Sequence, residues 1–273
     1  MQAKRIHLTK QIRLLKILNM PHIDPWDRKV TDERQADTVK MYVIFCEDNN
    51  CEPFYFRSFG QDGIKINTIP NQRQGRLNLL NTIEECKELG LMVFEENAYR
   101  LNKGIKERIW CVYDRDMENL EWEEIDQQDH LDFDVAIQSA VQSGLRVAWS
   151  NDAFELWILL HFEDVPVHGR IHRDYIYERL TQIFRLVEPR THELDAITGN
   201  VHFNYKTSFK RREYFLRHVL PFLKSKSRLD DAIRRASEIE ANFNGAIAFH
   251  LRNPCTQVHH LVTDILKNDF PPA

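Results

Sequence analysis

Acidic side chains follow two apolar segments of the sequence, at positions where they could bind a divalent metal ion. Asp114 and Asp116 come directly after RIWCVY (108–113), and Glu47 comes directly after MYVIFC (41–46). In extended backbone, residues two apart project to the same side, so we expect the two aspartates to point together. Carboxylates held side by side repel one another, and a bound Mg²⁺ or Mn²⁺ removes that cost. These residues therefore predict a Mg²⁺ (or Mn²⁺) site with Glu47, Asp114 and Asp116 as its ligands.

A solvated acidic loop is the alternative for the two aspartates. The acidic run continues beyond them through Glu118, Glu121, Glu123 and Glu124. Charge runs of this kind are often wet surface. Glu47 favours the metal site, because the carboxyl ends of parallel strands meet at one edge of a sheet.

Four further polar residues are candidates for the neighbourhood of this site: Glu52, Ser150, Asn151 and Glu155. The serine and the asparagine directly follow LRVAW (145–149), and the second glutamate stands among apolar residues, where a carboxylate needs a partner. Structural roles are the alternatives. Glu52 could stabilise the dipole of a helix in its first turn, and Asp152 with Glu155 has the spacing of a capping box.

One lysine stands apart from the basic clusters. Lys206 follows Phe203 and Tyr205 at the end of an irregular segment, where it could stabilise the charge of a phosphate near the metal. A plain surface lysine is an equally open interpretation. The clusters FKRR (209–212) and KSKSR (224–228) are typical of solvated helix faces.

Several other chemistries lack their motifs in this chain. The sequence contains no G-x-x-x-x-G-K-[ST] loop, no G-x-G-x-x-G, no H-E-x-x-H and no G-x-S-x-G. These absences argue against an ATPase, a dinucleotide enzyme, a zincin and a serine hydrolase. His161, in an apolar run, is expected to be a satisfied histidine rather than a ligand.

The elements that must position the site alternate between buried strands and helices, as in a parallel α/β sheet. The predicted strands are 41–46, 64–69, 108–113 and 145–149. The predicted helices are 53–59, 73–90 and 131–143. Gly90 is expected to end the second of them and Gly144 the third.

The pattern changes after the apolar run FELWILLHF (154–162). Helical periodicity then predicts helices at 172–186, 208–223, 228–242 and 257–267, with a loop at 187–203. We therefore divide the chain into a basic N-terminal arm (1–40), an α/β core (41–165) and a helical lobe packed on the core (166–273).

Composition is that of a globular protein, with 42% hydrophobic and 29% charged residues. The formal net charge of −4 excludes a basic shell, so a polyanion would have to meet a local basic groove or a metal ion. Five cysteines without zinc-finger spacing favour a reduced, cytoplasmic compartment. No signal peptide or membrane-spanning stretch is evident.

These motifs resemble the RloB family, a Toprim-like group encoded near restriction and abortive-infection loci. Its usual E-G-x-x-T-E-P-x-Y-F element corresponds to EDNNCEPFYF (47–56), with Asp48 in place of the glycine. Its D-x-D element corresponds to VYDRD (112–116). Its S-N-P-x-F-E-L-W-L-L-L-H-F element corresponds to SNDAFELWILLHF (150–162), with Asp152 in place of the proline. A Y-x-K-like element corresponds to Tyr205-Lys206 with a shorter spacing, and N-P-x-T to NPCT (253–256).

The resemblance implies a Toprim-like fold related to that of OLD-type nucleases. In that fold a glutamate after the first strand and a D-x-D after a later one hold Mg²⁺ for phosphodiester chemistry. It also implies a partner ATPase of the AAA/ABC type, encoded nearby.

We thus expect a metal-dependent endonuclease of DNA or RNA, tRNA included, acting as an antiphage effector. Glu47, Asp114 and Asp116 would hold the metal, Glu52 or Glu155 would extend the site or act as general base, and Lys206 would stabilise the phosphate. The alternative is a non-catalytic subunit that binds nucleic acid or the ATPase through a degenerate site. The substitution at Asp48 favours that alternative.

Overall fold

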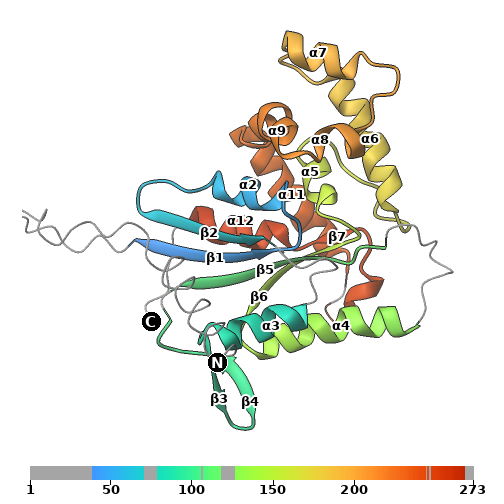
Figure 1. Cartoon of the computed structure of the whole chain (residues 1–273). Helices are drawn as coiled ribbons and strands as arrows, with labels where there is room; N and C mark the ends of the chain where they lie inside the picture. The colour runs from blue at the N-terminus through green and yellow to red at the C-terminus, as the bar shows by residue number, and fades with distance from the viewer. Residues whose placement is uncertain are drawn as a thin grey trace, which may run out of the picture.

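A five-stranded sheet lies at the centre of the computed structural model, which describes residues 39–70, 79–105, 107–117, 127–243, 245 and 247–267 (Figure 1). The strand order is β2-β1-β5-β6-β7. Neighbours are parallel from β2 to β6, and β7 is antiparallel to β6. The strands are β1 (Lys40–Cys46), β2 (Ile64–Pro70), β5 (Arg108–Asp114), β6 (Arg146–Asn151) and β7 (Cys255–Thr256). The predicted α/β class, with a mostly parallel sheet flanked by helices, is confirmed.

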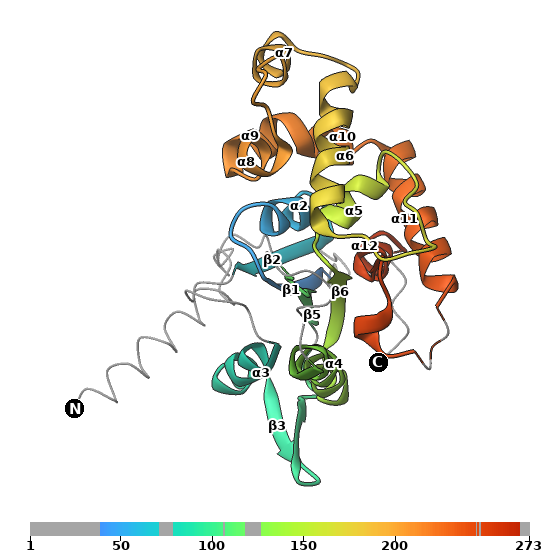
Figure 2. The same cartoon turned by 90° about the vertical axis from the view of Figure 1, so that its right-hand side faces the viewer.

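Helices cover both faces of the sheet (Figures 1 and 2). One face carries α3 (Leu79–Glu88) and α4 (Gln127–Gln142). The other carries α2 (Glu52–Arg57), α5 (Glu155–Leu160) and α12 (Val258–Lys267). Both faces of the central strands are therefore buried, which explains why their sequences are continuous apolar runs rather than alternating ones.

A second layer of helices lies over α2 and α5 (Figure 2). It comprises α6 (Arg173–Leu186), α7 (His192–Thr198), α8 (Tyr205–Phe209), α9 (Arg212–Tyr214), a π-turn (Phe215–Val219), α10 (Leu220–Leu223) and α11 (Lys226–Ala241). The division into a core of 41–165 and a lobe of 166–273 stays a prediction. The fifth strand, β7, and α12 of the sheet layer both come from the second of these segments.

Glycines end two helices as predicted. Gly90 and Gly144 have φ angles of 72° and 87°. Just beyond them, the N–H of Leu91 donates to the Cys86 carbonyl and the N–H of Leu145 to the Ala140 carbonyl. This left-handed glycine cap satisfies carbonyls that the helix end leaves exposed.

Three expectations for the connections were wrong or incomplete. The loop expected at 187–203 contains α7, whose start is capped by the hydroxyl of Thr191, which accepts from the N–H of Leu194 at 3.1 Å. The helix expected at 208–223 is interrupted between α8 and α9 and by the π-turn. A hairpin of β3 (Met92–Glu95) and β4 (Ala98–Leu101) was not predicted, because its turn residues lack the Asn-Gly signal that marks such turns.

Other expectations lie partly outside the described residues, namely the basic arm before residue 39 and the start of the helix expected at 73–90. Within the described part of the chain, no helix combines the length and apolarity needed to span a membrane. Its five cysteines are all buried free thiols.

The sheet has a topological switch point between β1 and β5. From β1 the chain crosses through α2 to β2 on one side, and it later returns through α3 to β5 on the other side. In open α/β sheets, the crevice at the carboxyl ends of two such strands is where ligands bind. Glu47 follows β1 and Asp114 ends β5, so the chain places both carboxylates at this crevice.

His161 is buried at the end of α5, as a neutral ring satisfied by the protein. Its Nδ1 lies 2.9 Å from the Trp157 carbonyl oxygen, and its Nε2 lies 3.5 Å from the Tyr55 hydroxyl. Burial lowers the pKa of His161 to about 4. Its predicted structural role is confirmed by these contacts.

This histidine makes stability depend on pH in a definite direction. The unfolded chain takes up a proton near pH 6.5, whereas the folded chain resists it until about pH 4, so stability is lost as pH falls through that window. His161→Gln should reduce the loss between neutral pH and pH 4 by about 3 kcal/mol, as urea unfolding at both pH values would measure. The exposed His168→Gln should keep the wild-type loss, and an unchanged pH dependence in His161→Gln would contradict the assignment.

Candidate metal site

Two carboxylates meet at the switch point, as the sequence predicted. Phe45 of β1 is paired with Cys111 of β5, which brings the ends of these strands level. The backbone N–H of Asp114 donates to Glu47 Oε2 across the gap. The side chain of Glu47 thus reaches from the end of one strand to the end of the other.

Glu52 lies beneath Glu47, where α2 begins. Its Oε2 accepts the N–H of Glu47 at 2.7 Å and that of Asp48 at 3.2 Å, and the residue is only 1% exposed. Burial raises the pKa of Glu52 well above its usual range, and the charges of Asp48, Asp114 and Glu47 raise it further. Glu52 is therefore more than a first-turn acid of its helix, since it fixes the backbone that follows β1.

Asp48 caps the turn before α2. Its carboxylate accepts the backbone N–H groups of Asn50, Cys51 and Glu52 at 3.0 to 3.2 Å. Burial nevertheless raises the pKa of Asp48, and Glu155 contributes to the same direction. The aspartate thus adds a negative charge near the site, but both of its oxygens accept hydrogen bonds from backbone N–H groups at the start of α2.

One carboxylate oxygen of Asp114 is available to bind a ligand. Its Oδ2 accepts the N–H of Phe154 at 2.7 Å. Its Oδ1 is buried and has no hydrogen-bond partner within the described part of the chain. Burial raises the pKa of Asp114 well above its usual range, and the charge of Glu155 adds to the effect. A buried carboxylate oxygen without a partner is costly unless a proton or a cation completes it.

Glu155 faces the same site from the first residue of α5 and has a lysine partner. The residue is 2% exposed, and the Nζ of Lys210 lies 2.8 Å from its Oε1. Lys210 also donates to the Tyr177 hydroxyl at 3.1 Å, which in turn donates to Glu155 Oε2 at 3.4 Å. The pKa of Lys210 is raised, because its attraction to Glu155 outweighs burial, which acts in the opposite direction.

The predicted lysine, Lys206, lies one helical turn from this pair. Its Nζ is 5.5 Å from the centre of the Tyr177 ring, as is the Nζ of Lys210. The sequence interpretation missed Lys210 because it stands in the basic cluster 209–212, which was assigned to a solvated face. The i,i+4 spacing of the two lysines, with Lys206 within α8 and Lys210 as its C-cap residue, was the available signal.

Asp116 departs from the prediction. The extended backbone of β5 ends at Asp114, and Asp116 has a left-handed φ of 53°, so the argument that both aspartates point together fails. Its Oδ1 accepts Arg173 Nη1 at 2.6 Å instead. Among the described residues, the carboxylates of Glu47, Asp114 and Asp116 do not all lie within 4.8 Å of one another.

Asp152 fixes the position of the Arg173 guanidinium. Both of its oxygens accept from the guanidinium, at 2.8 and 2.9 Å, and Oδ1 also accepts the N–H of Met117 at 2.8 Å. The capping box expected of Asp152 and Glu155 is absent, because α5 is preceded by Phe154, which makes no side-chain cap. A paired, hydrogen-bonded aspartate of this kind has a lowered pKa, and the Arg173 contacts outweigh burial in setting it.

Ser150 and Asn151 support the site from within the sheet. Ser150 Oγ lies 3.0 Å from Thr256 Oγ1 of β7. Asn151 Nδ2 donates to the His250 carbonyl at 3.0 Å, and the side chain of Asn253 donates to the backbone and side-chain oxygens of Asn151. These contacts join β6 to the NPCT segment and do not reach the carboxylates.

The donor set has the chemistry of a hard-cation site, although no three of its carboxylates bring an oxygen within 4.8 Å of one another among the described residues. Glu47, Glu52, Asp114 and Glu155 offer carboxylate oxygens at one crevice. Burial raises the pKa values of Glu52 and Asp114, and nearby negative charges add to it, those of Asp48, Asp114 and Glu47 for Glu52 and that of Glu155 for Asp114. Mg²⁺ and Mn²⁺ prefer such oxygens and remove the repulsion. The orphaned Oδ1 of Asp114 is the atom that such an ion would complete first.

Comparison with known proteins gives one match. The model of the family described as RloB-like protein matches residues 42–265. No curated protein and no solved structure matches the chain.

Asp114→Asn should separate stability from metal binding. Without metal, the substitution removes a buried charge and lets the amide donate toward the neighbouring carboxylates, so we expect the variant to be more stable by about 1–2 kcal/mol. Adding Mg²⁺ or Mn²⁺ should then stabilise the wild type and not the variant. Urea unfolding in chelator and in metal measures both effects, with the exposed Asp62→Asn as the control. A variant that is less stable than wild type in chelator would contradict the repulsion described above.

Proposed function

We propose that this chain, which belongs to the RloB-like protein family, is a Mg²⁺- or Mn²⁺-dependent nuclease that hydrolyses phosphodiester bonds. The observation that carries the proposal is the unpartnered, buried Oδ1 of Asp114 among carboxylates at the β1–β5 switch point. Excess buried negative charge in a ligand-binding crevice is the electrostatic setting of a divalent-metal site.

Glu47 and Asp114 would be the principal ligands, and Asp116 would join them once it leaves Arg173. Held by these carboxylates, such an ion would supply Lewis-acid chemistry for a phosphate and for an attacking water molecule. Glu52 holds the backbone of Glu47 through two N–H groups and so orients that ligand. Glu155 is the candidate general base, because its carboxylate faces Asp114 and is buried at the start of α5.

Two lysines are candidates for stabilising the charge of a bound phosphate. Lys210 lies against Glu155, and the Nζ atoms of Lys206 and Lys210 both lie 5.5 Å from the centre of the Tyr177 ring. A phosphate entering the crevice would compete with Glu155 for the Lys210 ammonium group and free the carboxylate to accept a proton. This exchange of partners gives the lysine the role of stabilising charge as it develops on the phosphate.

The biological setting is a proposal from the resemblance described above. It favours a cytoplasmic antiphage effector that acts with an AAA/ABC-type ATPase on DNA or on RNA such as tRNA. The formal charge of −4 supports the need for a partner, because the chain as a whole carries no net positive charge to attract a nucleic acid.

A non-catalytic subunit is the second candidate. The Asp116–Arg173 ion pair favours it, because one predicted ligand is neutralised by the protein itself. Such a subunit would bind nucleic acid or the ATPase through the same crevice without cleavage.

Cleavage assays on duplex DNA, single strands and tRNA distinguish the two candidates. With Mg²⁺ or Mn²⁺, alone or with the ATPase encoded beside it, the wild type should cleave and Asp114→Ala should lose about 100-fold or more of the rate. Asp62→Ala should match the wild type. Activity that survives Asp114→Ala, or no activity with any metal or partner, would exclude the nuclease.

The two lysines should differ in their effect on the rate. Lys210→Met removes the cation that contacts Glu155, so we expect kcat to fall about 10- to 100-fold with folding preserved by circular dichroism. Lys206→Met should lower kcat less, by about threefold, because it removes the other lysine beside Tyr177, and Lys210→Arg should retain part of the activity that Lys210→Met loses. Equal losses in both methionine variants would show that Lys210 has no special role.

A further inference from the structure

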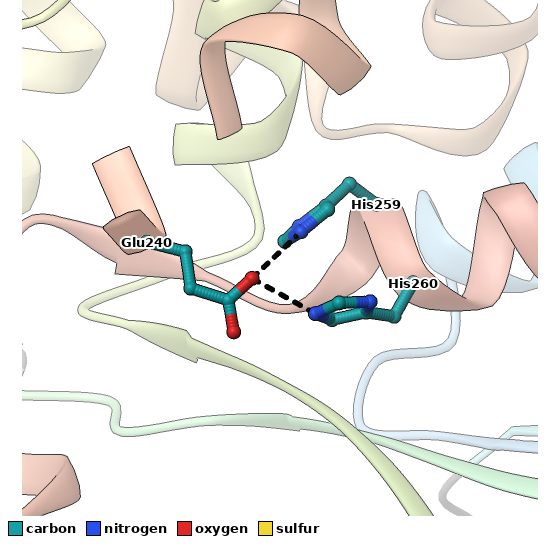
Figure 3. Close-up of side chains that lie close together, drawn as sticks. All are labelled: Glu240, His259 and His260. Atoms are coloured by element: carbon teal, nitrogen blue, oxygen red, sulfur yellow. Dashed lines mark hydrogen bonds and ion pairs between the residues drawn. The ribbon is translucent and has the colours of Figure 1, made fainter. Parts of the chain in front are cut away.

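A cluster of two histidines and a glutamate lies on a different part of the molecule from the carboxylate crevice. Glu240 stands near the end of α11, and His259 and His260 stand in the first turn of α12 (Figure 3). The Nε2 atoms of His259 and His260 lie 3.0 and 2.9 Å from the same oxygen, Glu240 Oε2. Within the described residues, this is the group of His, Cys, Asp and Glu side chains whose ligand atoms all lie within 4.8 Å of one another.

The tautomer of His259 is fixed by the backbone. Its Nδ1 lies 3.0 Å from the carbonyl oxygen of Thr256, which can only accept a hydrogen bond. The proton of a neutral ring must therefore be on Nδ1, and Nε2 then directs a lone pair at Glu240 Oε2. Two acceptors at 3.0 Å repel unless a cation lies between them, or unless the ring carries a second proton.

The surroundings disfavour the second proton on His259. The side chain is only 3% exposed, so a second positive charge on this ring would be shielded from water. The ring of His260 is 4.1 Å away between centroids, at an interplanar angle of 35°, so two imidazolium ions here would repel each other. One shared cation satisfies both rings and the carboxylate at once.

We propose that Glu240, His259 and His260 form a site for a divalent transition metal of the zinc class. Two imidazole nitrogens and one carboxylate oxygen are the ligand set that Zn²⁺ and its neighbours take, whereas Mg²⁺ prefers oxygen alone. The hydrogen bond from His259 to the Thr256 carbonyl is the outer-shell contact that orients a metal-binding histidine.

The exposure of the cluster leaves a coordination position open. His260 is 50% exposed and Glu240 is 34% exposed, so solvent or an external ligand can reach the metal. Metal binding would also have a structural consequence. A metal here joins the end of α11 to the start of α12, and both helices contact strands at the β6–β7 edge of the sheet.

Binding of Zn²⁺ and Co²⁺ to the full chain tests the site. The protein is first freed of transition metals and kept in excess Mg²⁺ to occupy the carboxylate crevice. It is then titrated with Zn²⁺ by calorimetry and with Co²⁺ by visible absorption. We expect one ion per chain, a d–d spectrum typical of nitrogen ligation, and a higher Tm with Zn²⁺. His260→Ala and Glu240→Gln should weaken binding at least tenfold, since each removes one of three ligands.

Two controls separate this site from others. The exposed His168→Ala should bind Zn²⁺ like the wild type, and Asp114→Asn should retain this ion because it alters only the crevice. His260 is half exposed, so its removal should leave the fold intact by circular dichroism. The proposal is overturned if the wild type takes up no Zn²⁺, if His260→Ala and Glu240→Gln bind it unchanged, or if Asp114→Asn alone abolishes uptake.

Discussion

Buried negative charge at the ends of β1 and β5 is the constraint around which this molecule is organised. Several carboxylates converge there, and backbone N–H groups or basic side chains compensate most of them. Backbone N–H groups satisfy Glu52 and Asp48, and Lys210 compensates Glu155. Arg173 compensates Asp116, which follows β5, and Asp152, which follows β6. Asp114 is the carboxylate that is least compensated, because its Oδ1 has no hydrogen-bond partner among the described residues. Burial makes these charges strong, and the same burial makes any uncompensated one expensive.

The sheet and its central pair of acids could be predicted from sequence, because both depend on local patterns. Continuous apolar runs mark strands covered on both faces, and an acid directly after such a run must lie at the sheet edge. Glu47 and Asp114 were located by that argument. β7 could not be found in this way, since two residues carry no periodicity and their pairing with β6 is set by distant contacts such as Ser150 with Thr256.

The details of the site depended on tertiary structure. Asp116 was assigned to extended backbone, but its left-handed conformation and its ion pair with Arg173 arise from a loop that packs on Asp152. Lys210 was assigned to a solvated face, but the fold turns it toward Glu155 across Tyr177. The pair of histidines beside Glu240 was likewise invisible, because Glu240 is brought to them by the packing of α11 on α12. Charge partners far apart in sequence are the part of a site that spacing alone does not reveal.

Arg173 also gives α6 a mechanical meaning. It is the first residue of a helix that runs to Leu186, a rod of roughly 20 Å at the usual rise per residue, and α7 lies at the far end, away from the sheet (Figure 1). At its other end, the Arg173 guanidinium contacts Asp116, in the loop after β5, and Asp152, which follows β6. One side chain at the start of α6 therefore joins this helix to the loops after two neighbouring strands. The orientation of α6 and the compensation of both aspartates consequently depend on the same residue.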